Sequence, residues 1–254
     1  MFTLHNGDCL EYMKSLPDKA FDLIVTDPPY GINADVAQNK NAGNKGGTRG
    51  GYYKKYHETS WDNSIPSKEV FAEMFRVSKN QIIFGGNYFT EYLPPSRCWI
   101  VWDKVVRAHF PDGEMAWGSF DKGLKIFRYS RADAYINSIK VKEHPTQKPV
   151  NLFNWILQNY SSENETIFDP FMGSGTTGVS CVAMGRVFTG CEIDQKYFEV
   201  AKKRLKLAAQ SPSFLTPSNN RLHLDVGDSP AQQALFTPEA DTAEGKLPAP
   251  APRR

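Results

Sequence analysis

Hydrophobic positions form short runs that alternate with longer amphipathic segments from the first residues to about residue 209. The short runs predict strands at residues 2–5, 21–26, 81–84, 98–102, 124–129, 166–168 and 187–191. The amphipathic segments predict a helix from residue 66 onward and helices at residues 10–16, 149–160, 176–184 and 195–209. This order of elements predicts an α/β fold, with a doubly wound and mostly parallel sheet.

The hydrophobic pattern stops in three places. Residues 31–60 are rich in glycine, asparagine and lysine, which is typical of a binding loop, although a simple insertion explains it too. Residues 103–143 mix basic and aromatic side chains with weak strand signals. Residues 210–254 are rich in Ser, Pro, Ala and Thr, which predicts a disordered tail. We therefore expect one folded domain, residues 1–209, with 31–60 and 103–143 as contact regions.

Composition bounds the class of protein. A chain of 254 residues with 40% hydrophobic content can bury one sizeable core. No long apolar span and no basic-then-apolar N-terminus occur, so we expect neither a membrane helix nor a signal peptide. The four cysteines are scattered without a C-x-x-C pair, which predicts a reduced, cytoplasmic protein with no metal site.

Positive charge is distributed unevenly. The net charge of +2 does not by itself indicate a nucleic-acid partner. Basic residues nevertheless crowd the two regions in which the hydrophobic pattern is weak, and such clusters are typical of phosphate contacts. We predict DNA contacts from Lys45, Arg49, Lys54 and Lys55 in the first region and from Lys104 and Arg107 in the second.

The stretch Asp27-Pro28-Pro29-Tyr30 follows a strand predicted to be buried. Two prolines end the strand, and Asp27 is biased towards an extended backbone because a proline follows it. The Asp27 carboxylate and the Pro28 carbonyl would then form two fixed hydrogen-bond acceptors beside the Tyr30 ring. A planar base with an exocyclic amino group needs two acceptors and a stacking surface. An ordinary proline turn explains the tetrapeptide equally well.

A second motif lies between a predicted strand and a predicted helix. Residues 173–178 read G-S-G-T-T-G, and Glu192 ends the following strand. This pattern is typical of nucleotide binding, in which a helix start holds an anion and an acid holds a ribose diol. A nicotinamide dehydrogenase is therefore an alternative. Against it, little foldable chain follows residue 209, and a dehydrogenase does not explain Asp27 to Tyr30.

Together the motifs resemble those of the DNA amino-methyltransferases, which use S-adenosylmethionine. The family's catalytic motif corresponds to Asp27-Pro28-Pro29-Tyr30, and its cofactor motif Phe-x-Gly-x-Gly to residues 171–175. Residues 144–149 (H-P-T-Q-K-P) are similar to the motif before the cofactor loop. The catalytic motif comes first, which is the order of the family's beta group. The resemblance implies a circularly permuted Rossmann-like fold, in which strand 2–5 pairs beside the strand that ends near Glu192.

The resemblance also implies a role for individual residues. Asp8 would face the cofactor adenine, with Cys9 beside it, and Glu192 would bind the ribose hydroxyls. Asp169 would pair with the methionine ammonium group. The methionine carboxylate would contact Lys148, Thr176 and Thr177. The remaining implied cofactor residues are Thr146, Pro170, Phe171, Gly173, Ser174 and Gly175, with Asp27 at the methyl group. For each residue, a capping or surface role is the alternative.

The implied reaction is transfer of a methyl group to the N6 amine of an adenine flipped out of double-stranded DNA. Cytosine N4 presents the same chemistry, but an Asp at position 27 is typical of the adenine enzymes, whereas Ser is commoner for cytosine N4. Methylation at cytosine C5 is disfavoured because no cysteine follows a proline. A nucleic-acid-binding module that keeps a vestigial cofactor fold is the non-enzymatic alternative.

Overall fold

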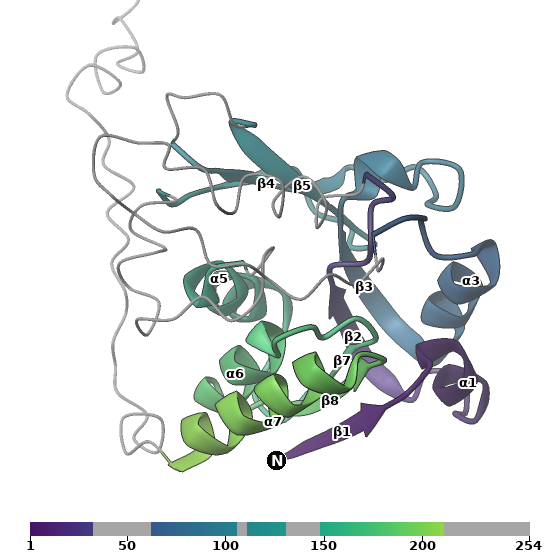
Figure 1. Cartoon of the computed structure of the whole chain (residues 1–254). Helices are drawn as coiled ribbons and strands as arrows, with labels where there is room; N and C mark the ends of the chain where they lie inside the picture. The colour runs from purple at the N-terminus through teal and green to yellow at the C-terminus, as the bar shows by residue number, and fades with distance from the viewer. Residues whose placement is uncertain (33–61, 106–110, 131–147, 211–254) are drawn as a thin grey trace, which may run out of the picture. The chain divides into compact units, whose positions relative to one another are not determined.

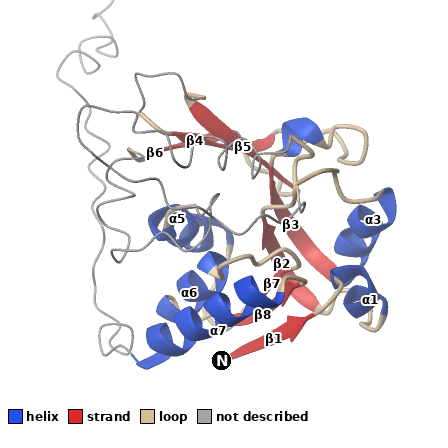
Figure 2. Cartoon of the chain, viewed as in Figure 1, coloured by secondary structure: helices blue, strands red, loops and turns tan. Residues whose placement is uncertain are grey.

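Eight strands form one sheet in the computed structural model, which describes residues 1–32, 62–105, 111–130 and 148–210. The order across the sheet is β1-β8-β7-β2-β3-β5-β4-β6, and Figure 2 shows these strands in red. The neighbours from β1 to β3 are all parallel, whereas β5 runs antiparallel to both β3 and β4. The strands are β1 (Phe2–Asn6), β2 (Phe21–Thr26), β3 (Ser78–Phe84), β4 (Cys98–Asp103), β5 (Gly113–Gly118), β6 (Lys125–Arg128), β7 (Thr166–Asp169) and β8 (Val187–Glu192).

Helices cover both faces of the sheet (Figure 1). On one face lie α1 (Cys9–Lys14) and α3 (Lys68–Val77), and on the other lie α5 (Val150–Tyr160), α6 (Thr176–Ala183) and α7 (Gln195–Gln210). A short 3-10 helix, η1 (Gly86–Tyr88), follows β3. The predicted doubly wound, mostly parallel α/β fold is confirmed. In the described part of the chain, no helix is long and apolar enough to cross a membrane.

Strand β2 is buried on both faces of the sheet, which explains why its sequence is a continuous apolar run. Leu23 and Val25 belong to the core under α5, α6 and α7, whereas Ile24 belongs to the core under α1 and α3. Successive side chains of a strand point to opposite faces, so a strand with helices on both sides needs apolar residues at every position. Residues 23–25 are accordingly at most 1% exposed.

Strand β1 pairs with β8, as predicted from the motif order. The two strands are parallel, with Phe2 opposite Phe188 and Asn6 opposite Glu192. Beyond the strand, Gly7 N donates to the Glu192 carbonyl at 3.0 Å. This pairing brings the turn that precedes α1 to the end of β8, so the two predicted adenosine-binding regions are neighbours.

Strand β5 was not predicted, and β3 begins earlier than predicted. The β5 sequence G-E-M-A-W-G begins and ends with glycine, and its burial pattern rises along the strand instead of alternating. Without alternation, a short strand gives no period-2 signal. Its position comes from pairing with β3 on one side and with β4 on the other.

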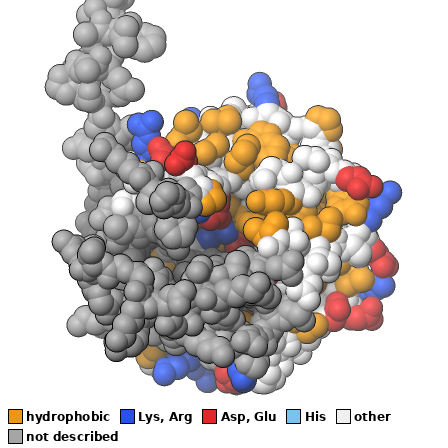
Figure 3. Space-filling view, turned by 45° about the horizontal axis from the view of Figure 1, so that its top comes forward, with side chains coloured by type: hydrophobic (Ala, Val, Ile, Leu, Met, Phe, Trp, Pro, Cys, Tyr) orange, Lys and Arg blue, Asp and Glu red, His pale blue; other side chains and the backbone are white. Residues whose placement is uncertain are grey.

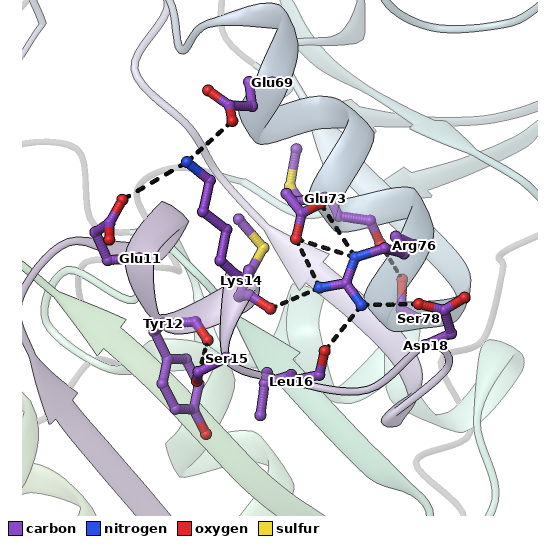
Figure 4. A network of polar contacts seen from close by, with 12 residues as sticks. Glu11, Tyr12, Lys14, Ser15, Leu16, Asp18, Glu69, Glu73, Arg76 and Ser78 are labelled. Carbon is purple, nitrogen blue, oxygen red and sulfur yellow. Dashed lines mark hydrogen bonds and ion pairs between the residues drawn. The ribbon is translucent and has the colours of Figure 1, made fainter.

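Arg76 joins α3 to the end of α1 (Figure 4). Its guanidinium donates to the Met13 carbonyl at 2.7 Å and to the Leu16 carbonyl at 2.8 Å. The same group pairs with Glu73 and Asp18. Carbonyls at a helix end lack partners within the helix, so Arg76 supplies the missing donors. The contact fixes the loop that leads into β2.

Asp22 and Thr166 join β2 to β7 by reciprocal hydrogen bonds. Thr166 Oγ1 donates to Asp22 Oδ2 at 2.8 Å and accepts from Asp22 N at 3.0 Å, and Thr166 N also donates to Oδ2 at 2.9 Å. Lys79 on β3 pairs with Asp22 Oδ1 at 2.7 Å. This cluster ties three neighbouring strands at the edge opposite their carboxyl ends.

We expect Thr166→Val to lower the free energy of unfolding by about 1–3 kcal/mol, because it leaves the Asp22 N–H without its acceptor. Urea unfolding of the variant and wild type measures the difference. The matched control is Thr3→Val on the exposed side of β1, which should change stability by no more than about 0.5 kcal/mol. Equal stability of both variants would show that the reciprocal contact contributes nothing.

Candidate active site

The turn Asp27 to Tyr30 lies at the carboxyl end of β2, where the prolines end the strand as predicted. Asp62 fixes the turn, because its Oδ1 accepts from Tyr30 N at 2.7 Å and from Gly31 N at 2.9 Å. Asp62 is 1% exposed. The Pro28 carbonyl accepts no hydrogen bond from the described part of the chain.

Asp27 belongs to a group of charged side chains from four elements, which we call the Asp27 cluster: Asp27, Tyr30, Lys104, Glu114 and Lys148. Tyr30 Oη donates to Asp27 Oδ1 at 2.5 Å, and the Lys148 ammonium pairs with Asp27 Oδ2. Lys148 also pairs with Glu114 Oε2 at 3.1 Å, and Lys104 pairs with Glu114 Oε1 at 2.5 Å. Both lysines are less than 9% exposed.

The protonation states follow from burial and pairing. Burial raises the pKa of Asp27, and the Lys148 charge opposes that rise without cancelling it. Burial also disfavours an anionic Glu114, but Lys148 and Lys104 lower its pKa to about 2. For Lys148, the two carboxylates outweigh burial and raise the pKa. Lys148 is therefore a cation at neutral pH, and Glu114 is an anion.

The Tyr30 ring lies against the turn after β3. Gly85 has φ of +69°, and a Cβ atom there would be 2.2 Å from Tyr30 Cε1, so only glycine allows this approach. Tyr88 stacks on Tyr30 with ring centroids 4.9 Å apart, and Tyr88 is 44% exposed. The two stacked rings lie beside Asp27. Stacking of a target base on Tyr30 stays a prediction.

The predicted cofactor loop joins β7 to α6. Gly173 N donates to Glu192 Oε2 at 2.9 Å, and Asp194 N donates to Oε1 at 2.8 Å. Burial raises the pKa of Glu192 to about 7. Gly175 has φ of +77°, and a Cβ atom there would meet Leu205 of α7 at 2.8 Å. This glycine is thus required by its backbone conformation and by packing against α7.

Arg204 of α7 holds the same loop. Its Nη1 donates to the Ser174 carbonyl at 2.5 Å, to Ser174 Oγ at 2.8 Å and to Thr176 Oγ1 at 3.3 Å. No sequence pattern indicated this contact, because Arg204 is 28 to 30 residues away on a helix with many basic side chains. The arginine fixes the glycine loop in place.

Asp169 is buried at the end of β7, between the two motifs. Its Oδ1 accepts from Thr26 Oγ1 at 2.7 Å and from Phe171 N at 3.1 Å, and its Oδ2 accepts from Thr177 Oγ1 at 2.6 Å. Burial raises its pKa to about 6. The proposed contacts of Asp169 and Thr177 with the methionine end of a cofactor stay predictions, and both side chains have a structural role here.

The remaining predicted cofactor residues lie nearby. Asp8 is exposed and caps α1, accepting from Leu10 N at 2.7 Å, so the capping alternative is observed. Cys9 follows it, and burial raises the pKa of its thiol to about 12. Pro170, Phe171 and Ser174 lie in the loop after β7.

One predicted DNA contact needs correction. Lys104 was expected at a phosphate, but it is buried and paired with Glu114, because β5 places an acidic residue beside the end of β4. Figure 3 shows acidic and basic side chains interspersed on one face of the described residues. The other predicted DNA contacts, and one predicted cofactor residue, lie outside the described residues: Lys45, Arg49, Lys54, Lys55, Arg107 and Thr146.

Several known methyltransferases are similar in sequence to this chain. A family model described as DNA methylase matches residues 94–203. Type II methyltransferase M.HinfI of Haemophilus influenzae is 27% identical over 262 residues, covering 83% of this chain and 70% of its own. M2.MboI of Moraxella bovis is 27% identical over 239 residues, which cover 80% of this chain and 87% of its own. The DNA adenine methyltransferase YhdJ of Escherichia coli is 26% identical over 264 residues (82% and 83%).

Solved structures share the fold. A putative DNA modification methylase of Thermus thermophilus, complexed with S-adenosyl-L-methionine, has a TM-score of 0.52 at 18% identity and covers 83% of this chain and 96% of its own. The cytosine-N4-specific PvuII DNA methyltransferase has a TM-score of 0.52 at 15% identity and covers 80% of this chain and 86% of its own. The fold is therefore that of the Rossmann-like methyltransferases. Within that class, the chain is similar to the DNA amino-methyltransferases of the adenine N6/cytosine N4 family, which confirms the resemblance predicted from the motifs.

The raised pKa of Asp169 should make the stability of the fold depend on pH. A carboxyl group whose pKa is raised by folding adds stability at low pH and loses it as pH rises through the folded pKa. With a pKa of about 6 against 3.8, we expect Asp169 to destabilise the wild type progressively from pH 4 to pH 6, by up to about 3 kcal/mol.

Asp169→Asn keeps the shape and removes the titration, so its stability should change less between pH 4 and pH 6. Urea unfolding at several pH values measures both curves. Asp121→Asn, an exposed pair with Arg97, is the matched control and should follow the wild type. Parallel curves for Asp169→Asn and wild type would refute the assignment.

Proposed function

We propose that this chain transfers a methyl group from S-adenosylmethionine to an exocyclic amine of DNA, with adenine N6 as the target. The observation that carries the proposal is the partly buried Asp27 at the end of β2, beside a Pro28 carbonyl and a tyrosine pair. A base amine is a poor nucleophile because its lone pair is delocalised into the ring. Two acceptors on its N–H bonds would favour a more tetrahedral nitrogen and make that lone pair available.

Asp27 and Pro28 would hold the amine, and Tyr30 would stack on the base. Positioning two reactants contributes roughly 7–11 kcal/mol to catalysis, so orientation is the main expected effect. The raised pKa of Asp27 suits a carboxylate that also takes the amine's proton after transfer. The base must first leave the duplex, which costs a few kcal/mol, and stacking on an aromatic ring returns about 1–3 kcal/mol.

The cofactor residues fit an adenosyl group with a methionine end. The turn before α1, the loop before α6 and Glu192 all lie at the carboxyl ends of adjacent parallel strands, β1, β7 and β8. Open α/β sheets bind ligands at this edge. When bound, the cofactor supplies a methyl group activated by the sulfonium. Glu192 would accept hydrogen bonds from the ribose hydroxyls, and Asp8 would contact the adenine.

Adenine N6 is favoured over cytosine N4 for two reasons. Asp27 is the acidic residue typical of the adenine enzymes, and YhdJ, named a DNA adenine methyltransferase, matches over most of both chains. Cytosine N4 is the second candidate, since the PvuII enzyme of that specificity has the same fold. The partner would be double-stranded DNA, contacted through residues 31–60 and 103–143, in the cytoplasm.

The catalytic role of Asp27 is tested by Asp27→Asn. We expect this variant to bind S-adenosylhomocysteine normally and to lose methyl transfer by at least about 100-fold, because one acceptor for the amine becomes a donor. Labelled cofactor and DNA, followed by mass spectrometry of the nucleosides, give the rate and distinguish N6-methyladenine from N4-methylcytosine. Asp121→Asn is the control. Undiminished transfer by Asp27→Asn would exclude the role, and absence of transfer by wild type would favour the binding-module alternative.

The role of Glu192 is tested by the pH dependence of cofactor affinity. Because the pKa of Glu192 is about 7, the acid is partly protonated at neutral pH. Affinity for S-adenosylhomocysteine, measured by calorimetry, should rise between pH 6 and pH 8. Glu192→Gln should bind about 10- to 100-fold more weakly at pH 8 and show no such rise. Glu199→Gln, exposed on α7, should behave like wild type, and a rise retained in Glu192→Gln would remove this residue from the site.

A further inference from the structure

Both carboxylate oxygens of Asp27 are engaged within the protein. Tyr30 donates to one oxygen and Lys148 pairs with the other. An amine that uses Asp27 as an acceptor therefore competes with Tyr30 and Lys148 for the lone pairs of these two oxygens. Lys148 is the partner that carries a full charge, and its ammonium is buried, so it needs a second anion when it moves away from Asp27.

Glu114 supplies that anion. Its Oε2 is 3.1 Å from Lys148 Nζ. One ammonium carries three N–H donors, so Lys148 can contact Asp27 and Glu114 at the same time. The Lys148 ammonium can thus move from Asp27 to Glu114 and stay paired with at least one carboxylate throughout.

Lys104 and the sheet hold Glu114 in place. Lys104 pairs with Glu114 Oε1 at 2.5 Å, and the Lys104 ammonium lies 5.1 Å from the centroid of the Trp102 ring. In the sheet, Glu114 is opposite Trp102 across the β4–β5 ladder. The backbone of Lys104 also donates to the Asp112 carbonyl at 2.9 Å. These contacts fix one Glu114 oxygen and leave the other directed at Lys148.

We propose that Glu114, held by Lys104, is a positioning residue that receives the Lys148 ammonium when the target amine takes its place on Asp27. The inference rests on the proposed function of Asp27. Glu114 acts only through Lys148 and contacts no reacting atom. Its effect is to open Asp27 to the base while keeping the lysine paired.

Among the described residues, four groups act on the charge of Asp27. Lys148 and Tyr30 act by contact, and Glu114 and Asp169 act through their charge at longer range. Glu114 raises the pKa of Asp27, so its neutralisation should lower that pKa. At the same time, Lys148 would pair with Asp27 alone and block it more firmly. A residue that only supported the fold would produce neither change.

The first experiment needs neither DNA nor cofactor. The pKa of Lys148 is measured by NMR of lysine labelled at Cε, with Lys148→Met to assign the resonance. In Asp27→Asn, Glu114 remains as partner, and the Lys148 pKa should stay near or above the ordinary lysine value. In Asp27→Asn/Glu114→Gln it should fall by at least about one pH unit, because burial is then unopposed.

Asp27→Asn/Asp121→Asn is the charge-matched control and should behave like Asp27→Asn. If an Asp27→Asn chain fails to fold, Asp27→Ser replaces it in the same comparison. Equal Lys148 pKa values with and without Glu114 would overturn the proposal. The result holds whatever reaction the chain performs, so it separates this inference from the proposed function.

The second experiment measures methyl transfer. Glu114→Gln should lower the single-turnover rate by about 10- to 100-fold, with affinity for S-adenosylhomocysteine unchanged, and should move the acidic limb of the pH–rate profile to lower pH. Adding Glu114→Gln to Lys148→Met should cause no further loss of rate, because Glu114 affects methyl transfer only through its pairing with Lys148. An additive loss, or an unmoved acidic limb, would overturn the positioning role.

Discussion

The buried carboxylate of Asp169 is the contact on which the geometry of both motifs depends. It accepts from Thr26 at the end of β2 and from Thr177 in α6, so one side chain joins the catalytic strand to the cofactor helix. An acid without charged partners is unfavourable in a core, and three donors compensate for its burial. The hydrogen bonds of Asp169 to Thr26 at 2.7 Å and to Thr177 at 2.6 Å therefore hold the two halves of the site together.

The positive and negative charges of the Asp27 cluster balance one another, and the cluster can still rearrange when a base binds. Two lysines and two carboxylates alternate from Asp27 to Lys104, and all four come from loops or strand ends at one edge of the sheet. Their mutual pairing is what keeps charges in a buried position. An incoming base would enter this arrangement as one more hydrogen-bond donor and rearrange it without adding a charge.

Much of the fold could be predicted from the sequence, because local patterns carry it. The buried run before Asp27 and the pairing of β1 with β8 both appear in the structure. The contacts that complete the site could not be predicted. Lys148 and Asp27 are 121 residues apart, and Glu114 lies on a strand without alternation. Long-range partners of charged side chains leave no local signal, so Lys104 was wrongly assigned to DNA.

The β1–β8 pairing has a consequence for the order in which the domain folds during synthesis. Phe2 of β1 lies opposite Phe188 of β8, so β1 leaves the ribosome long before the strand with which it pairs. Contacts of such separation form slowly, because the whole intervening chain must be closed into a loop. Until β8 is made, β1 exposes an unpaired backbone edge and apolar side chains. An unpaired edge of this kind can pair with other chains, so the interval before β8 is made is the stage at which aggregation is most favoured.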